Sequence, residues 1–248
     1  MHGIVAEMIF RGERMEIVGG KMEKFNENNE TKTLIYLIRH GESIGNLNKI
    51  CLGHTDLGLT ERGKEQARAT ANALSSLDFA GFYTSDLIRA VQTIEPHMEL
   101  RSIDPDRAVR SAELRELYFG EWENAAVEDL KNEYGDMFTV GWRQNFGTFT
   151  PPQGESVADC ADRMNRAVAK IASLHVGRKI LVVSHAAAIR ALWGKILGLK
   201  AEDVCSAVPF PSNASYSILE YDVIDGALRP IEYSVDTHLS ELRTALPS

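Results

Sequence analysis

The sequence predicts an α/β fold: a single three-layer α/β/α domain with a mostly parallel central sheet. Three observations lead to this prediction. The uncharged runs 34–38 and 180–183 have the composition of strands that are buried on both faces of a parallel sheet. Segments with strand character alternate along the chain with segments of helical period. A chain of 248 residues is long enough to bury one such core.

The first predicted strand ends at Arg39 and His40 and leads into a glycine-rich loop, 41–58. Thr60 has the side chain of a helix N-cap, and apolar residues recur after it at helical spacing. These features predict a strand, a loop and a helix in succession. Ligands of open α/β sheets bind outside the carboxyl ends of strands, so we expect function to gather where this strand ends.

A second strand is predicted at 79–84, with Ser85 as the cap of a helix that runs through Arg89. Pro96 is expected to end or kink that helix because proline lacks the backbone N–H. Ala108 and Val109 are a brief strand candidate before the polar segment 113–122.

Residues 123–150 are expected to form a helix followed by a loop. Ser156 and Asp159 then resemble a capping box, and apolar residues recur along one helical face as far as Leu174. The next apolar run predicts a buried strand at 179–184, which delivers His185 to its carboxyl end, and a helix at 186–197.

Two more strands are predicted at 216–221 and 228–234, the second at a sheet edge because it contains Pro230. Residues 1–32 show no sustained period and end in a strongly polar stretch, so we expect a flexible N-terminal leader. The domain is expected to span 33–240, and 241–248 to form a C-terminal tail.

Composition excludes several classes of protein. A net charge of −8 argues against a general nucleic-acid or anionic-membrane surface, since both depend on clustered Lys and Arg. No apolar run approaches the length of a membrane span, and the start lacks the features of a secretory signal, so we expect a cytoplasmic protein. The three cysteines are far apart, which predicts free thiols. The oligomeric state stays open, with a homodimer among the options.

Four distant segments carry residues that suit phosphoryl transfer. Arg39, His40 and His185 follow predicted strands, Arg89 opens a helix, and Glu116 lies in the polar segment. An imidazole can attack phosphorus, guanidinium groups match phosphate oxygens, and a carboxyl group can carry the leaving-group proton. A metal site is the competing interpretation of two histidines. It is weaker because adjacent arginines repel a cation and no further ligand cluster accompanies them.

The chain resembles the histidine phosphatase superfamily, in the branch of cofactor-dependent phosphoglycerate mutases and their phosphatase relatives. The resemblance extends over residues 33–221 and rests on six blocks in family order. They are Leu37-Ile-Arg-His-Gly-Glu-Ser43 with Asn46, Leu59-Thr-Glu-Arg-Gly-Lys-Glu-Gln-Ala67, Ser85-Asp-Leu-Ile-Arg-Ala-Val-Gln-Thr93, Leu114-Arg-Glu-Leu-Tyr-Phe-Gly-Glu-Trp-Glu123, Gly154-Glu-Ser156 and Val183-Ser-His185.

The resemblance implies that His40 is a nucleophile that forms a phosphohistidine and that Glu116 is the proton donor, with Glu113 as the alternative donor. It implies that the transferring phosphoryl group is bound by Arg39, Asn46, Arg89 and His185. Ser43 and Gly53 would lie nearer the periphery of the pocket. We expect a small phosphorylated metabolite as substrate, no cofactor and no metal.

We expect a phosphatase, with a phosphoglycerate mutase as the alternative and a non-catalytic phospholigand-binding module as a second one. Laid on a mutase without gaps, this chain keeps one substrate-binding arginine, Arg143. The tyrosine, lysine and second arginine of a mutase fall on Phe119, Val127 and Gln144. The mutase insert after the proline pair at 151–152 is also missing. A shorter cover should admit water to the phosphohistidine.

Overall fold

The computed structural model describes residues 8–10, 13–18, 21–24, 31–142 and 144–244. In these ranges six strands form the main sheet, in the order β6-β5-β7-β4-β8-β9. The strands are β4 Lys32–Arg39, β5 Gly81–Ser85, β6 Val109–Ser111, β7 Lys179–Ser184, β8 Tyr216–Asp222 and β9 Ala227–Val235. Strands β6, β5, β7 and β4 pair in parallel, and β8 runs against both of its neighbours. The predicted α/β fold with a mostly parallel sheet is confirmed.

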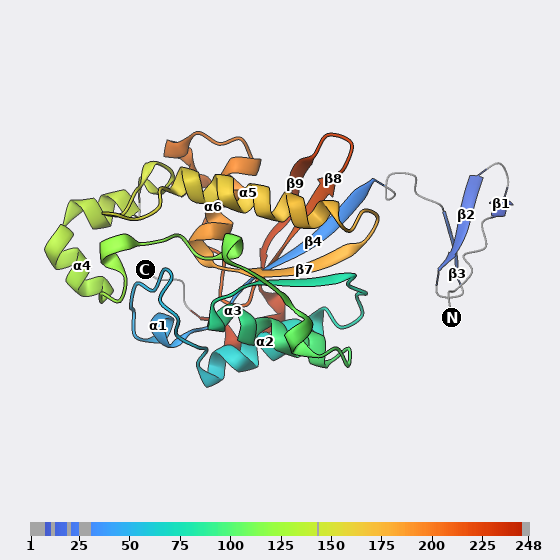
Figure 1. Cartoon of the computed structure of the whole chain (residues 1–248), viewed down its shortest axis with the longest axis horizontal. Helices are drawn as coiled ribbons and strands as arrows, with labels where there is room; N and C mark the ends of the chain where they lie inside the picture. Colours follow the sequence, from blue (N-terminus) through green and yellow to red (C-terminus); the bar gives the residue numbers. More distant parts are fainter. Residues whose placement is uncertain (1–7, 11–12, 19–20, 25–30, 143, 245–248) are drawn as a thin grey trace.

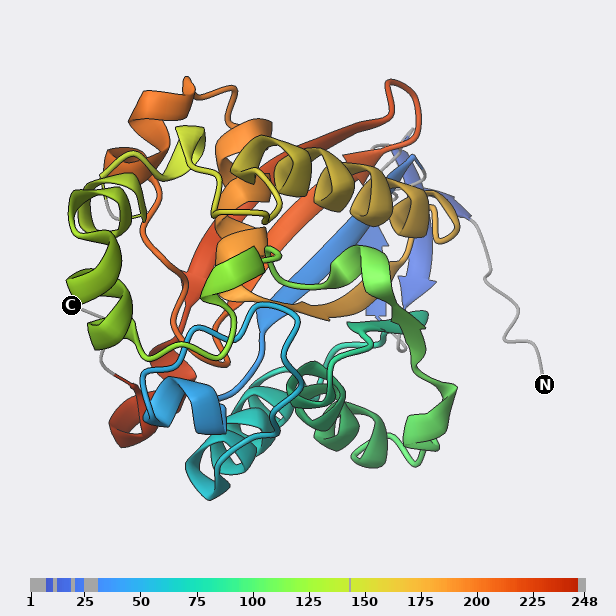
Figure 2. The ribbon, with the colours of Figure 1, turned by 60° about the vertical axis from the view of Figure 1, so that its left-hand side comes forward.

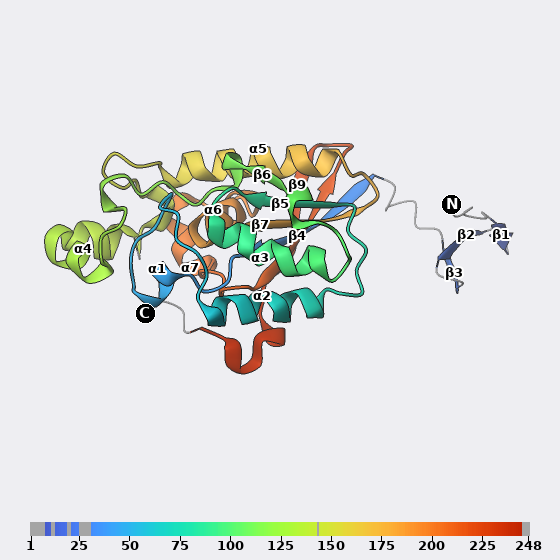
Figure 3. The ribbon, with the colours of Figure 1, turned by 60° about the horizontal axis from the view of Figure 1, so that its bottom comes forward.

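Helices cover both faces of this sheet (Figures 1 and 3). Helices α2 Glu61–Ala73 and α3 Ile88–Glu99 lie on one face, and α5 Val157–Ser173 and α6 Ala186–Ile196 lie on the other. Side chains of β4 alternate between the two cores: Ile35 and Leu37 pack in the α5–α6 core, and Tyr36 and Ile38 in the α2–α3 core. This double burial is why the strand reads as an uninterrupted apolar run.

Shorter helices complete the domain. They are α1 Ile44–Leu47, α4 Val127–Tyr134, α7 Val204–Ala207 and a π-helical turn, η5 Met137–Trp142. Helices α1 and α4 lie on the side toward which the carboxyl ends of β4 and β7 point (Figures 1 and 2). None of the helices in the described ranges has both the length and the apolar composition that crossing a bilayer requires.

Predictions of helix caps and strand edges were correct at some positions and wrong at others. Thr60 and Ser156 cap α2 and α5 as expected, and β9 with Pro230 lies at a sheet edge. Helix α3, however, is capped by Leu87 and not by Ser85, and it continues through Pro96 to Glu99. Proline removes one backbone hydrogen bond, but residues on both sides of it, Ile94 and Met98, are buried and keep the helix intact.

Regular structure also occurs where we expected the flexible leader. Strands β1 Met8–Phe10, β2 Glu13–Val18 and β3 Lys21–Lys24 form an antiparallel sheet of three strands, separate from the main sheet in the described residues. Polar and apolar residues alternate in Arg14-Met15-Glu16-Ile17. This period of two indicates a strand, and it is missed when only a longer period is sought.

The other end of the chain packs on α2. The 3-10 segment η8 spans Thr237–Leu242 and so crosses the limit expected at 240. Gln66 Nε2 donates to the Leu242 carbonyl oxygen at 2.7 Å, and Arg62 Nη2 donates to the carbonyl oxygens of Glu241 and Arg243 at 2.8 Å. Residues 241–243 are therefore held against the domain by backbone acceptors.

Candidate active site

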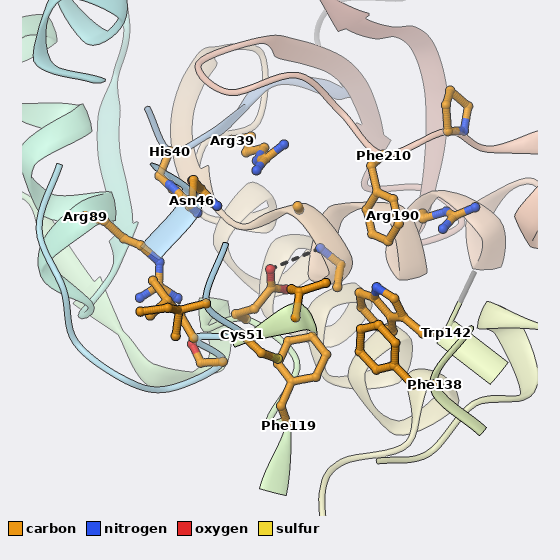
Figure 4. A pocket seen from close by; sticks show the side chains of 18 residues that line it. Arg39, His40, Asn46, Cys51, Arg89, Phe119, Phe138, Trp142, Arg190 and Phe210 are labelled. Carbon is orange, nitrogen blue, oxygen red and sulfur yellow. Dashed lines mark hydrogen bonds between the residues drawn. The ribbon is translucent and has the colours of Figure 1, made fainter. Parts of the chain in front are cut away.

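The predicted site residues gather where β4, β7 and β5 end (Figure 4). His40 follows β4, His185 follows β7, and Arg89 lies in the first turn of α3, after β5. Glu116 follows β6 and a 3-10 turn, Ala112–Leu114. Together with Arg39 these side chains are at most 8% exposed. Charged side chains are rarely buried to this degree unless they are paired or functional.

His40 is held in a defined tautomer. Its Nδ1 lies 2.7 Å from the carbonyl oxygen of Gly41, and because a carbonyl oxygen can only accept, Nδ1 carries the proton and Nε2 keeps its lone pair. Burial and the cations of Arg89 and Arg39 lower the pKa of His40 well below its ordinary value. The imidazole is therefore neutral at neutral pH, the state in which Nε2 is nucleophilic.

Gly41 fits this turn because it has no side chain. A Cβ on Gly41 would lie 2.4 Å from the carbonyl oxygen of Gly63 in α2. The Gly41 N–H donates to Thr93 Oγ1 of α3 at 3.0 Å. The loop after His40 is thus clamped to α2 and α3, which fixes the carbonyl that orients the ring.

Two buried arginines give the site its positive charge. Arg89 donates through Nη1 to the Thr55 carbonyl oxygen at 2.8 Å and through Nη2 to the Gly53 carbonyl oxygen at 2.7 Å. Arg39 donates through Nη1 to the Pro211 carbonyl oxygen at 2.6 Å, and its buried Nε has no partner among the described residues. Burial lowers the pKa of each to about 10, so both stay charged at neutral pH. Backbone carbonyls orient the guanidinium groups without neutralising them.

Glu116 lies at the N-terminus of α6. Its Oε1 accepts from the N–H groups of Ala188 at 2.8 Å and Leu117 at 3.0 Å, and its Oε2 accepts from the N–H of Ala187 at 3.2 Å. These three N–H contacts fix the orientation of the carboxyl group. Oε2 has the fewer and longer contacts, and Glu116 lines the cavity described below. This geometry leaves Oε2 as the atom that can exchange a proton with a ligand.

Asn46 lines the cavity, whereas His185 packs beside His40 and does not line it. The rings of His185 and His40 lie 5.1 Å apart between centroids, and both ring nitrogens of His185 are buried without a partner among the described residues. Burial, then the charge of Arg89, lowers the pKa of His185 well below its ordinary value. Asn46 reaches the cavity from α1 (Figure 4).

The peripheral residues fall in different places. Gly53 lines the cavity and supplies an acceptor to Arg89. Ser43 does not line it, because its Oγ accepts from the Asn46 N–H at 3.2 Å as the N-cap of α1. Arg143 lies outside the described residues. Glu113 is exposed and away from the cavity, so of the two candidate proton donors only Glu116 reaches the site.

A cavity of about 400 Å³ joins this polar end to an apolar end (Figure 4). The polar end carries Arg39, His40, Asn46, Arg89 and Glu116. The apolar end is formed largely by Phe119, Phe138, Trp142 and Phe210, which we call the aromatic wall. No group of three or more His, Cys, Asp or Glu side chains in the described part of the chain is arranged to hold a metal. Two fixed cations beside a neutral imidazole and one carboxyl group suit the transfer of a phosphoryl dianion.

Comparison with known proteins identifies the family of this chain. A family description of the "Histidine phosphatase superfamily (branch 1)" matches residues 35–231. The chain belongs to this superfamily. It is 36% identical over 171 residues to a "Probable phosphoglycerate mutase GpmB" of Photorhabdus laumondii, covering 67% of this chain and 76% of the relative. It is 31% identical over 168 residues to "Adenosylcobalamin/alpha-ribazole phosphatase" of Escherichia coli, covering 68% of this chain and 81% of the relative.

Among solved structures, "Bacillus stearothermophilus YhfR" matches this histidine phosphatase superfamily chain with a TM-score of 0.76 and 27% identity. The match covers 84% of this chain and 99% of that structure. The resemblance drawn from the six motifs is thereby confirmed at the level of the superfamily. The names of the relatives include both a mutase and a phosphatase, so they leave the choice of reaction to the site itself.

Sequence reasoning missed most of the cavity wall in this superfamily member. Trp122 is fully buried in the core, whereas Trp142 lines the cavity. Arg190 and Phe210, which we did not single out, also line it. The uninterrupted match to mutases around Phe119 is the signal that could have located part of the wall.

Asn213 is a further residue that sequence reasoning missed. It is 4% exposed, and its Nδ2 donates to Asn46 Oδ1 at 3.0 Å and to the His40 carbonyl oxygen at 3.2 Å. Asn46 Oδ1 also accepts from the Ser43 N–H at 3.1 Å. Two donors therefore fix which end of the Asn46 amide is oxygen, and the amide nitrogen is left to donate to a ligand.

We predict that Asn213→Ala lowers kcat/KM for phosphate esters by roughly tenfold, the effect of one or two lost orienting hydrogen bonds. Asn46→Ala should have a similar effect. Because Asn213 is expected to act through Asn46, the double variant should be no worse than Asn46→Ala alone, which steady-state kinetics of all three variants measures. Additive losses would show that Asn213 acts independently of Asn46.

Proposed function

We propose that this protein hydrolyses small-molecule phosphate monoesters through a phosphohistidine on His40. The observation that carries the proposal is the buried neutral imidazole, with Nδ1 bonded to Gly41 and its Nε2 lone pair available, beside two charged guanidinium groups. A nucleophile held in one tautomer beside fixed cations requires little rearrangement to attack a phosphoryl group.

The reaction would proceed in two steps. His40 Nε2 forms a bond to phosphorus while the bond from phosphorus to the ester oxygen breaks, and protonated Glu116 gives its proton to that oxygen. Glu116 then takes a proton from water as the water oxygen bonds to phosphorus and the phosphorus–nitrogen bond breaks, which releases phosphate and restores His40. Arg39 and Arg89 stabilise the charge on the phosphoryl oxygens in both steps.

The second candidate function is that of a phosphoglycerate mutase, which the 36% identity to a relative of that name favours. The cavity wall argues against it. Phe119 and Val127, which stand where a mutase has a tyrosine and a lysine, both line the cavity, and Gln144 is exposed and away from it. Phe119 and Val127 thus supply neither the hydroxyl nor the cation that a mutase has at these positions to hold the carboxylate of phosphoglycerate long enough to return the phosphoryl group.

The test compares two activities of the purified protein. Phosphate release from simple esters is measured beside the interconversion of 3- and 2-phosphoglycerate with bisphosphoglycerate present. The rate of hydrolysis should exceed the rate of interconversion by about 100-fold or more. This is the expected effect of losing the two or three charged or hydroxyl contacts by which a mutase holds its substrate. Interconversion that greatly exceeds hydrolysis would make the protein a mutase. Tight phosphate binding with neither activity would favour the non-catalytic module.

A further inference from the structure

We propose that the alcohol part of the substrate is a large apolar or aromatic group, held against the aromatic wall of Phe119, Phe138, Trp142 and Phe210. This inference rests on the proposed function, because it names the class of ester that the site hydrolyses. It starts from the shape and chemistry of the cavity beyond the phosphoryl end (Figure 4).

The cavity is much larger than a phosphoryl group needs. Its volume of about 400 Å³ lies within the range of pockets that enclose whole organic ligands. The labelled groups at the polar end, Arg39, His40, Asn46 and Arg89, lie on one side in Figure 4, and the aromatic wall lies on the other. A substrate with its phosphate at the polar end therefore places its alcohol part beside the wall.

The apolar end offers few partners for hydroxyl groups. Among the described residues, it is lined besides the four aromatic rings by Ile50, Leu52, Val127 and Pro209, and its polar side chains other than the Trp142 indole are those of Cys51 and Arg190. Burial raises the pKa of the Cys51 thiol, so this side chain is uncharged and only a weak hydrogen-bond donor. A sugar or glycerol moiety would lose its hydrogen bonds to water here and regain few, whereas an apolar group gains from burial.

The wall is preformed by contacts between its own rings. Trp142 meets Phe119 edge to face at 4.9 Å between centroids and lies 5.5 Å from Phe210. Phe146, behind the wall, packs on Trp142 at 5.2 Å and on Phe210 at 5.6 Å. Such interlocked rings keep their positions without a ligand, and a planar group can pack on them with little loss of conformational freedom.

Among the described lining residues, Arg190 points to a different ligand, one with a second anionic group. Its contacts argue for a structural role. Nε donates to the Val208 carbonyl oxygen at 2.6 Å and Nη2 to the Cys205 carbonyl oxygen at 2.9 Å. The guanidinium carbon lies 4.2 Å from the Phe210 ring centroid and 4.6 Å from that of Phe146. Arg190 thus holds Phe210 in the wall by cation–π contact.

The test uses alkyl phosphates whose leaving alcohols have similar acidity, so that differences in rate report binding and not leaving-group chemistry. We expect kcat/KM for 3-phenylpropyl phosphate to exceed that for glycerol 3-phosphate by about tenfold to 100-fold, the discrimination that a few apolar groups give. Equal values would overturn the inference. A preference for 3-phosphoglycerate over both would also overturn it and assign the far end to anion binding by Arg190.

Variants of the half-buried Phe210 separate the wall from the chemistry. Phe210→Ser should lower kcat/KM for 3-phenylpropyl phosphate by about tenfold and leave that for ethyl phosphate nearly unchanged, and Phe210→Leu should restore much of the loss. Equal losses on both esters would mean that Phe210 only supports the fold. Circular dichroism and the melting temperature establish that each variant is folded.

Binding to the His40→Ala protein distinguishes this inference from the proposed function. By calorimetry, 3-phenylpropylphosphonate should bind about tenfold more tightly than methylphosphonate. If it does so although the unaltered protein hydrolyses no ester, the proposed function fails and the apolar subsite stands. Hydrolysis of all esters without preference, together with equal binding of both phosphonates, would support the proposed function and rule out the apolar subsite.

Discussion

Replacement of His40 by alanine is expected to lower phosphatase turnover by on the order of 10⁴-fold or more, the size of loss seen when a catalytic nucleophile is removed. In the structure, His40 is the imidazole whose tautomer is set by a backbone acceptor, Gly41, and whose low pKa keeps it neutral beside Arg39 and Arg89. Among the described residues that line the cavity, His40 carries the only imidazole.

The measurement combines steady-state turnover with a search for the intermediate. Protein quenched in alkali during turnover should carry a phosphoryl group, and His40→Ala protein should carry none. His175→Ala is the matched control, since His175 contacts Tyr83 away from the cavity and should leave turnover unchanged. A folded His40→Ala protein with near-normal turnover would rule out His40 as the nucleophile and direct attention to His185 or to direct attack by water.

Replacement of Glu116 by glutamine is expected to slow alkyl phosphates by roughly 10²- to 10⁴-fold, the usual contribution of a general acid. An alkoxide leaves poorly unless it is protonated, whereas a nitrophenolate needs little protonation. The kcat/KM for a nitrophenyl phosphate, which reports transfer to His40 and not the later attack of water, should therefore fall by no more than about tenfold. The loss of rate on the alkyl ester, compared with the loss on the aryl ester, is the quantity that reports proton donation by Glu116.

Two controls make this prediction specific to Glu116. Glu113→Gln changes the exposed carboxylate outside the cavity and should leave both rates unchanged. Glutamine also loses the contact to the Ala187 N–H, which lies 3.2 Å from Oε2, so the melting temperature is measured for each variant. Equal slowing of alkyl and aryl esters would mean that Glu116 organises the N-terminus of α6 and does not transfer a proton.

The sequence predicted the main sheet because its strands carry local signals. An apolar run buried on both faces, as in β4 and β7, needs no knowledge of its neighbours to be recognised. Side-chain caps such as Ser156 are equally local. Helix α3 does not end at Pro96, where distant packing outweighs a local preference, and the short alternating pattern of β2 was not recognised as a strand.

The sequence by itself determined which polar residues gather at the candidate site. Arg39, His40 and His185 stand at the carboxyl ends of buried strands, and strands of a parallel sheet bring such ends together in any chain that forms the sheet. Only the tertiary structure decided the apolar half of the cavity and the contact of Asn213 with Asn46. Phe119, Trp142 and Phe210 lie on irregular segments, where no period relates the side chains, so they meet only because of how those segments pack over the strand ends.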